Sequence, residues 1–287
     1  MEKIKAENGV VFYRSLLLKS PHAFSTRIGG VSTAGVLKGL NLTVTQRDGE
    51  TRKNVMVNLA RFCEAIGISK NKILSLPACN GEYILEATKD DLLKSYYNAP
   101  ELAAFAHYKK GFDGYVTQER DVAIGMKTAD CLPVLFEYLE NELHVVASAH
   151  VGCKDDETNP MCNIHNITQL VIEKLLFLGA APQNIRVALG PCVHTCCCMT
   201  SNIIISILEK ELGVTKVAQY CKRSGEGTWS VDMIKMNYDF IVDIGILPSN
   251  IDVCDVCTAC NTDVFYSRFK EGKKTGSMLS VIALPEE

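Results

Sequence analysis

Short apolar runs separated by turn-forming residues fill the middle of the chain, and they constrain its fold more than any other feature. Residues 73–86 and 113–147 contain the runs YILEA, GYVT, VAIGM, PVLFEY and LHVVASAH, which Gly, Pro, Asn and Asp interrupt. Runs rich in β-branched and aromatic residues between turn formers are typical of β-strands. Residues 10–18 and the following HAFSTR, which ends at GGVST, add an opening pair of strands. The sequence therefore predicts a mixed β-sheet.

Segments with helical periodicity lie on both sides of these strands. Between residues 48 and 68, apolar side chains recur every three or four positions before Gly67, at Val55, Leu59, Phe62 and Ile66. This spacing predicts an amphipathic helix that the glycine ends. Similar patterns predict helices within 167–179, 200–212 and 230–245, while IRVALG is expected to be a buried strand, and IDVCD and FYSR closing elements. We expect an α/β (α+β) fold of mixed β-sheets flanked by helices, layered in a single domain over residues 1–287.

The composition excludes several classes of protein. With 47% hydrophobic and 22% charged residues, the chain can bury a core, and its formal charge of −3 creates no basic field for nucleic acid. The N-terminus MEKIKAENGVVFYRS carries charges where a signal peptide is apolar, and no stretch approaches the ~18 apolar residues that a membrane span needs. Thirteen cysteines, an odd and clustered set, indicate reduced thiols rather than a disulfide framework. The sequence predicts a cytoplasmic protein with no nucleic-acid or membrane partner.

The segments TADCLPVLF and SAHVGCK hold the residues most suited to chemistry. Cys131 and His150 each lie at the edge of an apolar strand, beside a break that contains Gly or Asp. A thiolate and an imidazole that converge can bind Zn²⁺ or a similar metal, with a coordination position left open for catalysis. They can equally act as nucleophile and base. A buried thiol beside an unrelated histidine is the structural alternative.

A third candidate group lies in LSLPACNGEYILEA, where a polar turn interrupts two apolar runs. Cys79 can supply a thiolate, whereas Asn80 can supply only an amide oxygen, a weak ligand for zinc. The two assignments predict different metal affinities.

Two further cysteine clusters stand apart from these motifs. In CVHTCCCM, residues 192–199, adjacent cysteines point in divergent directions, so most are expected to be core or loop thiols. The spacing of Cys254, Cys257 and Cys260 is closer to that of a metal site, but a single C-x-x-C unit without a matching second pair falls short of a zinc ribbon. The loops G-x-x-x-x-G-K-S and G-x-G-x-x-G are absent from the sequence, so no nucleotide-cofactor motif is present.

Eight motifs give the chain a family likeness, in the order HAFSTRIGGVS, GLNL, DGYVT, KTADCLPVLF, VVASAHVGCK, ALGPCV, VDMIKMN and CTACNTDVFYS. In this order and over nearly the whole chain, they resemble the laccase-domain family, once described as multicopper polyphenol oxidases. Members of that family are understood as purine nucleoside phosphorylases that also deaminate adenosine. The resemblance implies mixed β-sheets flanked by helices, similar to the fold of certain cysteine-hydrolase toxins.

The resemblance also assigns residues. Cys131 matches the metal-ligand cysteine of the family's A-D-C-x-P motif, and His150 matches the ligand histidine of its A-H-x-G-W motif. Arg27 and Asn41 match residues that line the substrate pocket, and an arginine there offers a planar donor fork for phosphate.

The chain also departs from the family pattern. Asn80, or Cys79 after a shift of one residue, stands at the first ligand histidine. Cys153 replaces an aromatic residue, Lys154 keeps the basic one and Asp155 replaces a glycine. Arg268 and Lys270 approximate the displaced basic residues of the C-terminal motif.

The leading hypothesis is a purine nucleoside phosphorylase, a glycosyl-transferring enzyme with Cys131, His150, Arg27, Asn41 and Lys154 as its catalytic residues. Cys79, Cys131 and His150 would hold zinc, with copper as the other metal, while Arg27 and Lys154 receive phosphate. Its substrates would be adenosine, inosine or methylthioadenosine with phosphate, and adenosine deamination would be a second activity. Two alternatives remain: a thiol hydrolase using Cys131 and His150, and a member without turnover that binds a purine or a partner. A monomer and a homodimer are both compatible with the sequence.

Overall fold

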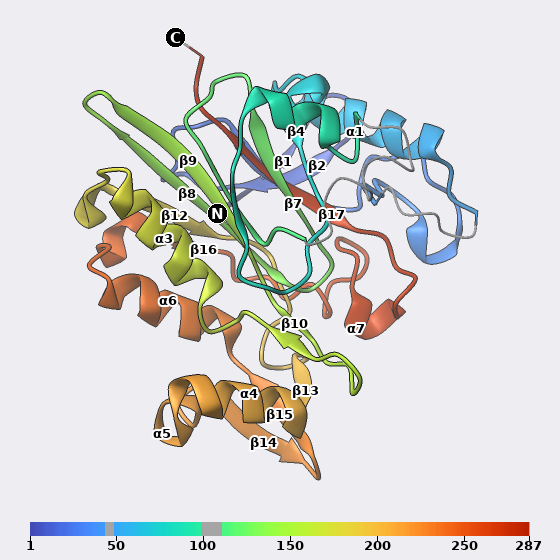
Figure 1. The fold of residues 1–287 in the computed structure, drawn as a ribbon. Coiled ribbons are helices and arrows are strands. Elements are labelled where there is room, and N and C mark those ends of the chain that lie inside the picture. The colour runs from blue at the N-terminus through green and yellow to red at the C-terminus, as the bar shows by residue number, and fades with distance from the viewer. Residues whose placement is uncertain (44–48, 99–110, 287) are drawn as a thin grey trace.

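The computed structural model describes residues 1–43, 49–98 and 111–286, and two six-stranded mixed sheets form its centre (Figure 1). The first sheet has the strand order β1 (Glu2–Lys5), β2 (Val11–Arg14), β3 (His22–Ser25), β17 (Met278–Ala283), β7 (Ala123–Thr128) and β4 (Ile73–Leu74). Its neighbouring strands are antiparallel except for the parallel pair β4 and β7.

The second sheet has the order β16 (Ile251–Val253), β12 (Arg186–Leu189), β8 (Leu132–Glu140), β9 (Leu143–Val151), β6 (Gly114–Thr117) and β5 (Ile84–Glu86). The edge strands β16 and β5 pair parallel with their neighbours, and the inner pairs are antiparallel. Apolar side chains of both sheets meet in one buried cluster that includes Phe24, Ile124, Tyr115 and Leu135. The two sheets therefore pack face to face.

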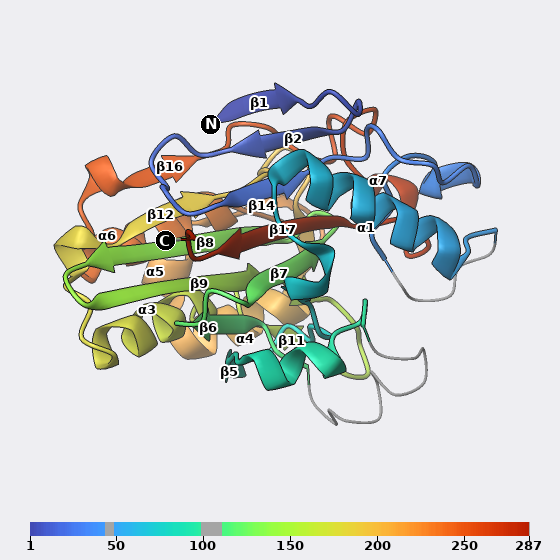
Figure 2. The same ribbon diagram turned by 90° about the horizontal axis from the view of Figure 1, so that it is seen from above.

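Helices cover the outer faces of this pair of sheets, as Figure 2 shows from above. Helix α1 (Arg52–Ile66) packs Val55, Leu59 and Phe62 against the first sheet. Helices α3 (Ile167–Phe177) and α6 (Met233–Asp243) pack in the same way on the second sheet. The predicted fold class, mixed β-sheets flanked by helices in layers, is confirmed.

A small lobe lies below the second sheet in Figure 1. It contains β13 (Met199–Ser201), α4 (Asn202–Leu212), α5 (Val214–Val217), β14 (Cys221–Gly225) and β15 (Thr228–Val231), with the strand order β13, β15, β14. The described residues also form the shorter elements β10 (Cys153–Lys154), β11 (Met161–Cys162), α7 (Arg268–Glu271) and 3₁₀ turns at Gly35–Leu37, Lys70–Lys72, Lys89–Lys94, Pro182–Asn184 and Pro248–Asn250.

Local chemistry explains where the predicted helices begin and end. The Thr51 hydroxyl accepts a hydrogen bond from the Asn54 N–H at 3.1 Å and so caps α1. Gly67 ends the helix with φ of 69°, a left-handed conformation that glycine adopts without strain. Asp48, where the expected helix begins, lies outside the described residues. Ser201 and Asp232 cap α4 and α6 through their side chains.

Several elements differ from the sequence predictions. Residues 152–163, where the sequence predicts no regular element, contain the short hairpin of β10 and β11, whose register pairs Cys153 with Cys162. The strands β14, β15 and β17 were not predicted. β17 is buried along its whole length between β3 and β7, so it lacks the alternation of apolar and polar residues that marks a half-exposed strand. In the described part of the chain, no helix has the length and apolar character needed to cross a membrane.

Candidate active site

The hairpin of β8 and β9 brings Cys131 and His150 to the same end of the second sheet. Its register runs from Glu140 opposite Leu143 to Leu132 opposite Val151. One further step of this register places Cys131 opposite Gly152. Because side chains alternate between the two faces of a strand, His150 lies on the same face as position 152 and diagonally across from Cys131. The hairpin thus explains how residues nineteen positions apart can share a site.

Gly152 leaves the space that the Cys131 thiol occupies. A Cβ atom at position 152 would lie 2.5 Å from Cys131 Sγ and 2.9 Å from Asn80 Nδ2. These contacts are shorter than van der Waals separation, so only glycine fits there without moving its neighbours. Cys131 and Asn80 therefore converge on the backbone of Gly152.

Asp113 holds His150 in place from the neighbouring strand. The carboxylate lies 2.7 Å from His150 Nδ1, and both residues are buried. It also accepts hydrogen bonds from the backbone N–H groups of Cys79, Asn80 and Gly81 at 2.9–3.1 Å. Since Nδ1 is engaged, the opposite ring nitrogen, Nε2, is the one available for chemistry. Asp113 belongs to the motif DGYVT, which was noted in the sequence although its aspartate was not identified as a site residue.

Burial and neighbouring charges shift the pKa values of His150 and Asp113 in opposite directions. Burial by itself lowers the pKa of His150, but the adjacent Cys131 and Asp113 raise that pKa to about 10. Burial likewise opposes ionisation of Asp113, but its hydrogen bond and charge interaction with His150 hold the pKa of the carboxyl below its usual value. In the metal-free protein at neutral pH, His150 and Asp113 therefore form a buried ion pair.

The turn at residues 79–81 settles which side chain lies beside Cys131. Asn80 adopts φ of 58°, and its buried Nδ2 has no hydrogen-bond partner among the described residues. The Cys79 thiol instead points to the Asp113 carboxylate at 3.3 Å and the Gly111 carbonyl at 3.7 Å. Asn80 thus shares the space beside Gly152 with Cys131, and its amide nitrogen is an unsatisfied donor directed into the site.

Asp130, next to Cys131, fixes the turn that presents the thiol. It adopts φ of 90°, a conformation that costs energy for a residue with a side chain. Its carboxylate accepts hydrogen bonds from the Thr258 and Ser267 hydroxyls at 2.6 and 3.0 Å and from the Phe269 N–H at 2.8 Å. The C-terminal segment of the chain therefore holds Cys131 in position.

Arg27 lies in a dense network of contacts. Its guanidinium pairs with Glu271 at 2.7 Å, donates to the backbone carbonyls of Val36, Lys38 and Thr262, and stacks over Tyr266 at 4.4 Å. These bonds engage four of the five N–H donors of an arginine. In this arrangement Arg27 joins the N-terminal loop to α7.

Asn41 is fully buried, and its side chain connects two loops. The amide nitrogen donates to Glu50 at 2.8 Å, and the amide oxygen accepts from the N–H groups of Thr43 and Ser277 at 3.1 and 3.2 Å. Its contacts in the structure are therefore with the protein backbone and Glu50.

Lys154 ends the short strand β10 after Gly152, and Asp155 is the next residue. Lys154 is partly exposed and lies 3.5 Å from Asp156. Asp155 accepts hydrogen bonds from Thr200 and from both the N–H and the hydroxyl of Ser201 at 2.6–3.0 Å. The aspartate that replaces the family's glycine therefore ties the site segment to the first residues of the small lobe.

The other reactive groups lie elsewhere. Among the residues that the structure describes, one set of ligand atoms converges within 4.8 Å, those of Cys196, Cys197, Cys257 and Cys260, and this Cys-rich cluster could hold a metal ion. Cys79, Cys131 and His150 do not form such a set in the described residues.

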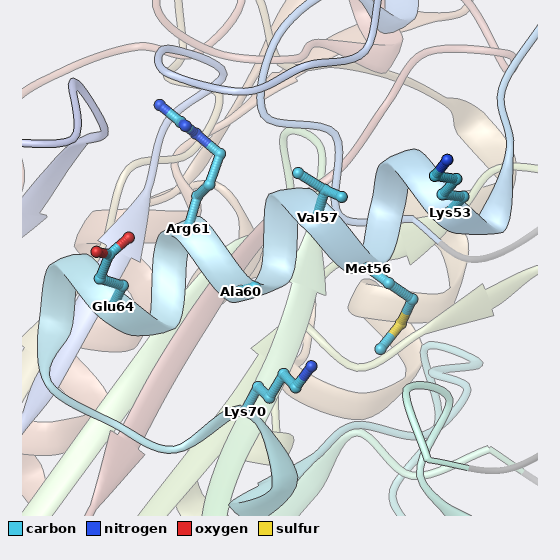
Figure 3. A pocket seen from close by; sticks show the side chains of 7 residues that line it. All are labelled: Lys53, Met56, Val57, Ala60, Arg61, Glu64 and Lys70. Carbon is cyan, nitrogen blue, oxygen red and sulfur yellow. The ribbon is translucent and has the colours of Figure 1, made fainter.

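A surface hollow of about 530 Å³ lies along α1, where Figure 3 shows its side chains. Two of its charged groups are engaged structurally, because Arg61 donates to the Gly29 carbonyl at 2.7 Å and Glu64 accepts from Asn8 at 2.9 Å. The hollow contains no cysteine or histidine. The candidate active site is therefore the one at Cys131 and His150.

A cysteine beside a buried histidine–aspartate pair is an arrangement found in enzyme active sites. The chain belongs to the multi-copper polyphenol oxidoreductase laccase family, whose sequence profile matches residues 21–285. The resemblance seen in the sequence is thereby confirmed.

Relatives of known name cover most of the chain. A purine nucleoside phosphorylase of Deinococcus radiodurans is 29% identical over 281 residues, which are 96% of this chain and 94% of that protein. The purine nucleoside phosphorylase YlmD of Geobacillus stearothermophilus is 25% identical over 268 residues, 92% of each chain. The adenosine deaminase RL5, from an unknown prokaryotic organism, is 23% identical over 168 residues, 58% of this chain and 60% of that protein.

The crystal structure of YlmD from Geobacillus stearothermophilus has the same fold. It aligns with a TM-score of 0.79 at 22% sequence identity, covering 100% of this chain and 98% of that one.

Proposed function

We propose that this protein is a purine nucleoside phosphorylase that acts on adenosine or inosine, and on methylthioadenosine, with phosphate. The names of its relatives support an enzyme of this class. The observation that carries the proposal is the group formed by Cys131, Asn80 and the His150–Asp113 pair around Gly152. In the reaction, a phosphate oxygen forms a bond to C1′ of the ribose while the bond from C1′ to the purine nitrogen breaks, and the base leaves with a proton.

The side chains at this site fit a catalytic metal ion. They offer one strong ligand fewer than the family pattern, because Asn80 stands where the family has a ligand histidine. Cys131 Sγ and His150 Nε2 would hold zinc or copper, and Asn80, whose unpartnered Nδ2 faces the site, would become a third ligand only by turning its amide oxygen inward. The Cys79 thiol would become the third ligand only after its 3.3 Å hydrogen bond to the Asp113 carboxylate breaks. A bound metal ion would supply a Lewis acid for phosphate or water. The role of Asp113 is to fix the His150 ring so that Nε2 faces the site.

Lys154 is the residue that we assign to phosphate. It follows Gly152 by two positions, and its partly exposed ammonium makes only a 3.5 Å contact with Asp156. Arg27 would have to exchange its 2.7 Å pair with Glu271 for phosphate. We therefore assign Arg27 and Asn41 to positioning the loops around the pocket, and not to binding phosphate.

Phosphate-dependent release of purine base tests the proposal. Purified protein would be incubated with adenosine, inosine, guanosine or methylthioadenosine, with and without phosphate, and the products separated by chromatography. We expect free base and the sugar 1-phosphate only when phosphate is present. His150→Gln should abolish base release, whereas His144→Gln, at the far end of the same strand β9, should leave it unchanged. Absence of base with all four nucleosides would refute the proposal.

Adenosine deamination is a second activity that the relative RL5 suggests by name. The same assay separates it from phosphorolysis, because deamination converts adenosine to inosine without phosphate and without release of base. We expect inosine to accumulate in the phosphate-free reaction, and its absence there would exclude this activity.

Thiol hydrolysis is the second candidate function, since Cys131 lies beside His150, which Asp113 orients. Because the pKa of His150 is raised to about 10, its imidazolium would pair with a Cys131 thiolate nucleophile and act as a base only after giving its proton to the leaving group. Selective alkylation of Cys131 by iodoacetamide in metal-free protein, found by peptide mass spectrometry, would support it. An inert Cys131 under conditions that modify the exposed Cys260 would count against it.

We propose further that residues 1–287 form one domain. In support, the largest buried cluster combines residues of β8 and β9 with residues of α4 and α6, so the small lobe shares its core with the second sheet. A single cooperative unfolding transition would support this proposal, and two separate transitions would oppose it.

A further inference from the structure

Two cysteine clusters that are separated by some sixty residues meet at the surface near the small lobe. Cys196 and Cys197 lie in the segment that leads into β13, and Cys257 and Cys260 lie in the loop after β16. The four Sγ atoms all lie within 4.8 Å of one another. The C-x-x-C unit of the C-terminal loop thus gains the second pair of thiols that the sequence alone did not reveal.

The spacing of these sulfur atoms matches a tetrahedral metal–thiolate centre. With zinc–sulfur bonds of about 2.3 Å, the corners of a regular tetrahedron lie about 3.8 Å apart. The measured separations are 3.7 Å from Cys196 to Cys257, 3.6 Å from Cys196 to Cys260 and 3.5 Å from Cys197 to Cys260. A disulfide would need about 2.05 Å. The four thiols are therefore close enough to bind one metal ion, and these three separations are too long for disulfide bonds.

We propose that Cys196, Cys197, Cys257 and Cys260 bind one zinc ion in a closed, structural site, separate from the pocket at Cys131. Four thiolates complete a tetrahedral shell, so no position is left open for a substrate. The His194 N–H points to Cys257 Sγ at 3.4 Å, a hydrogen bond that stabilises negative charge on the sulfur. Cys196 and Cys260 are exposed, so zinc can reach the site from solvent.

The zinc site would fix the segment that positions Asp130. The loops that carry the four cysteines are also joined by the bond from the Thr258 N–H to the Cys192 carbonyl at 2.9 Å. From these loops, the Thr258 hydroxyl and the Val193 N–H bind the side chain and the carbonyl of Asp130 at 2.6 and 2.9 Å. Because Asp130 precedes Cys131, zinc would stabilise the active-site turn without taking part in the reaction.

Metal analysis of the full-length protein tests the proposal. Zinc would be measured in the wild type, in Cys260→Ala and in two controls, Cys254→Ala and Cys131→Ala. Cys254 has the same C-x-x-C spacing to Cys257 but lies outside the cluster. We expect Cys260→Ala to contain one zinc ion fewer than wild type and than Cys254→Ala. Cys131→Ala should keep the zinc of the cluster, which distinguishes this site from the proposed catalytic one.

Two measurements on the wild type make the test independent of how the variants fold. Cobalt(II) bound in place of zinc should give the sulfur-to-cobalt charge-transfer and d–d absorption of a tetrahedral tetrathiolate centre. The exposed thiols of Cys196 and Cys260 should react with a thiol reagent only after a chelator removes the metal. Free reaction of these thiols in untreated protein, a disulfide among the four cysteines, or an iron–sulfur chromophore in place of zinc would each overturn the proposal.

Discussion

Gly152→Ala is the substitution that probes the active-site geometry most sharply. The new Cβ would lie 2.5 Å from Cys131 Sγ and 2.9 Å from Asn80 Nδ2. Non-bonded heavy atoms prefer about 3.5 Å or more, so the thiol has to move by about 1 Å. Cys131 Cβ, at 3.1 Å, limits how far rotation of the side chain alone can relieve the contact.

The effect on stability should be moderate and the effect on activity large. Overpacking costs about 1–3 kcal/mol, and removing the extra backbone freedom of glycine from the unfolded chain returns about 0.5–1 kcal/mol. The net loss of about 0–2.5 kcal/mol corresponds to a Tm lower by at most roughly 10 °C for a chain of this size. A displacement of about 1 Å at a reacting group can reduce the rate by about 10²-fold. We therefore expect kcat/KM for phosphorolysis to fall by about two orders of magnitude.

The assay compares thermal unfolding and base release for wild type, Gly152→Ala and Gly225→Ala. Gly225 is the matched control, because a Cβ there would meet only Thr228 Cβ at 3.9 Å, an ordinary contact. Its Tm and activity should stay close to those of wild type. If Gly152→Ala is as active as Gly225→Ala, then Cys131 does not lie against Gly152 in the working enzyme, or its position does not matter for the reaction.

Three further predictions follow from the contacts around the site. In metal-free protein, Asp113→Asn should lower the free energy of unfolding by about 3–5 kcal/mol, measured with denaturant, because it leaves the buried His150 without its ion-pair partner. Cys131 and Asp113 together raise the pKa of His150 from 6.5 to about 10, so the stabilisation that protonated His150 gains from these two neighbours is complete below pH 6.5 and is lost as the pH rises toward 10. The difference in unfolding free energy between wild type and Asp113→Asn should therefore shrink over that range, and a constant difference would contradict the ion pair. Lys154→Gln should raise KM for phosphate more than it lowers kcat. Glu271→Gln breaks the ion pair with Arg27 and should mainly lower the free energy of unfolding, by about 1.5–3 kcal/mol.

The sequence carried enough information for the hairpin that builds the site. PVLFEY and LHVVASAH are strongly β-forming and close in sequence, so their pairing is local and their register follows from the short turn between them. Cys131 and His150 could be identified because they flank these strands. Asp113 could not be chosen as their partner, since its role depends on β6 pairing with β9, a contact between strands that are not consecutive.

Long-range contacts explain the remaining differences. The strand β17 pairs with β3 and β7, which lie more than a hundred residues away in sequence, and its uniformly apolar residues carry no periodicity that predicts a face. The four-cysteine cluster could not be predicted for the same reason. Its ligands come from two distant segments, and neither CVHTCCCM nor the C-terminal C-x-x-C unit contains a full set. The burial of Arg27 against Glu271 depends on α7, which folds back over the N-terminal loop.

A crystal structure of the protein with adenosine and phosphate bound would test the central claim most directly. We predict that the nucleoside lies in contact with the groups around Gly152, with His150 still paired to Asp113 through Nδ1, and that phosphate lies near Lys154. A nucleoside bound at another place on the protein, or a site in which Cys131 and His150 point away from the ligand, would contradict the account.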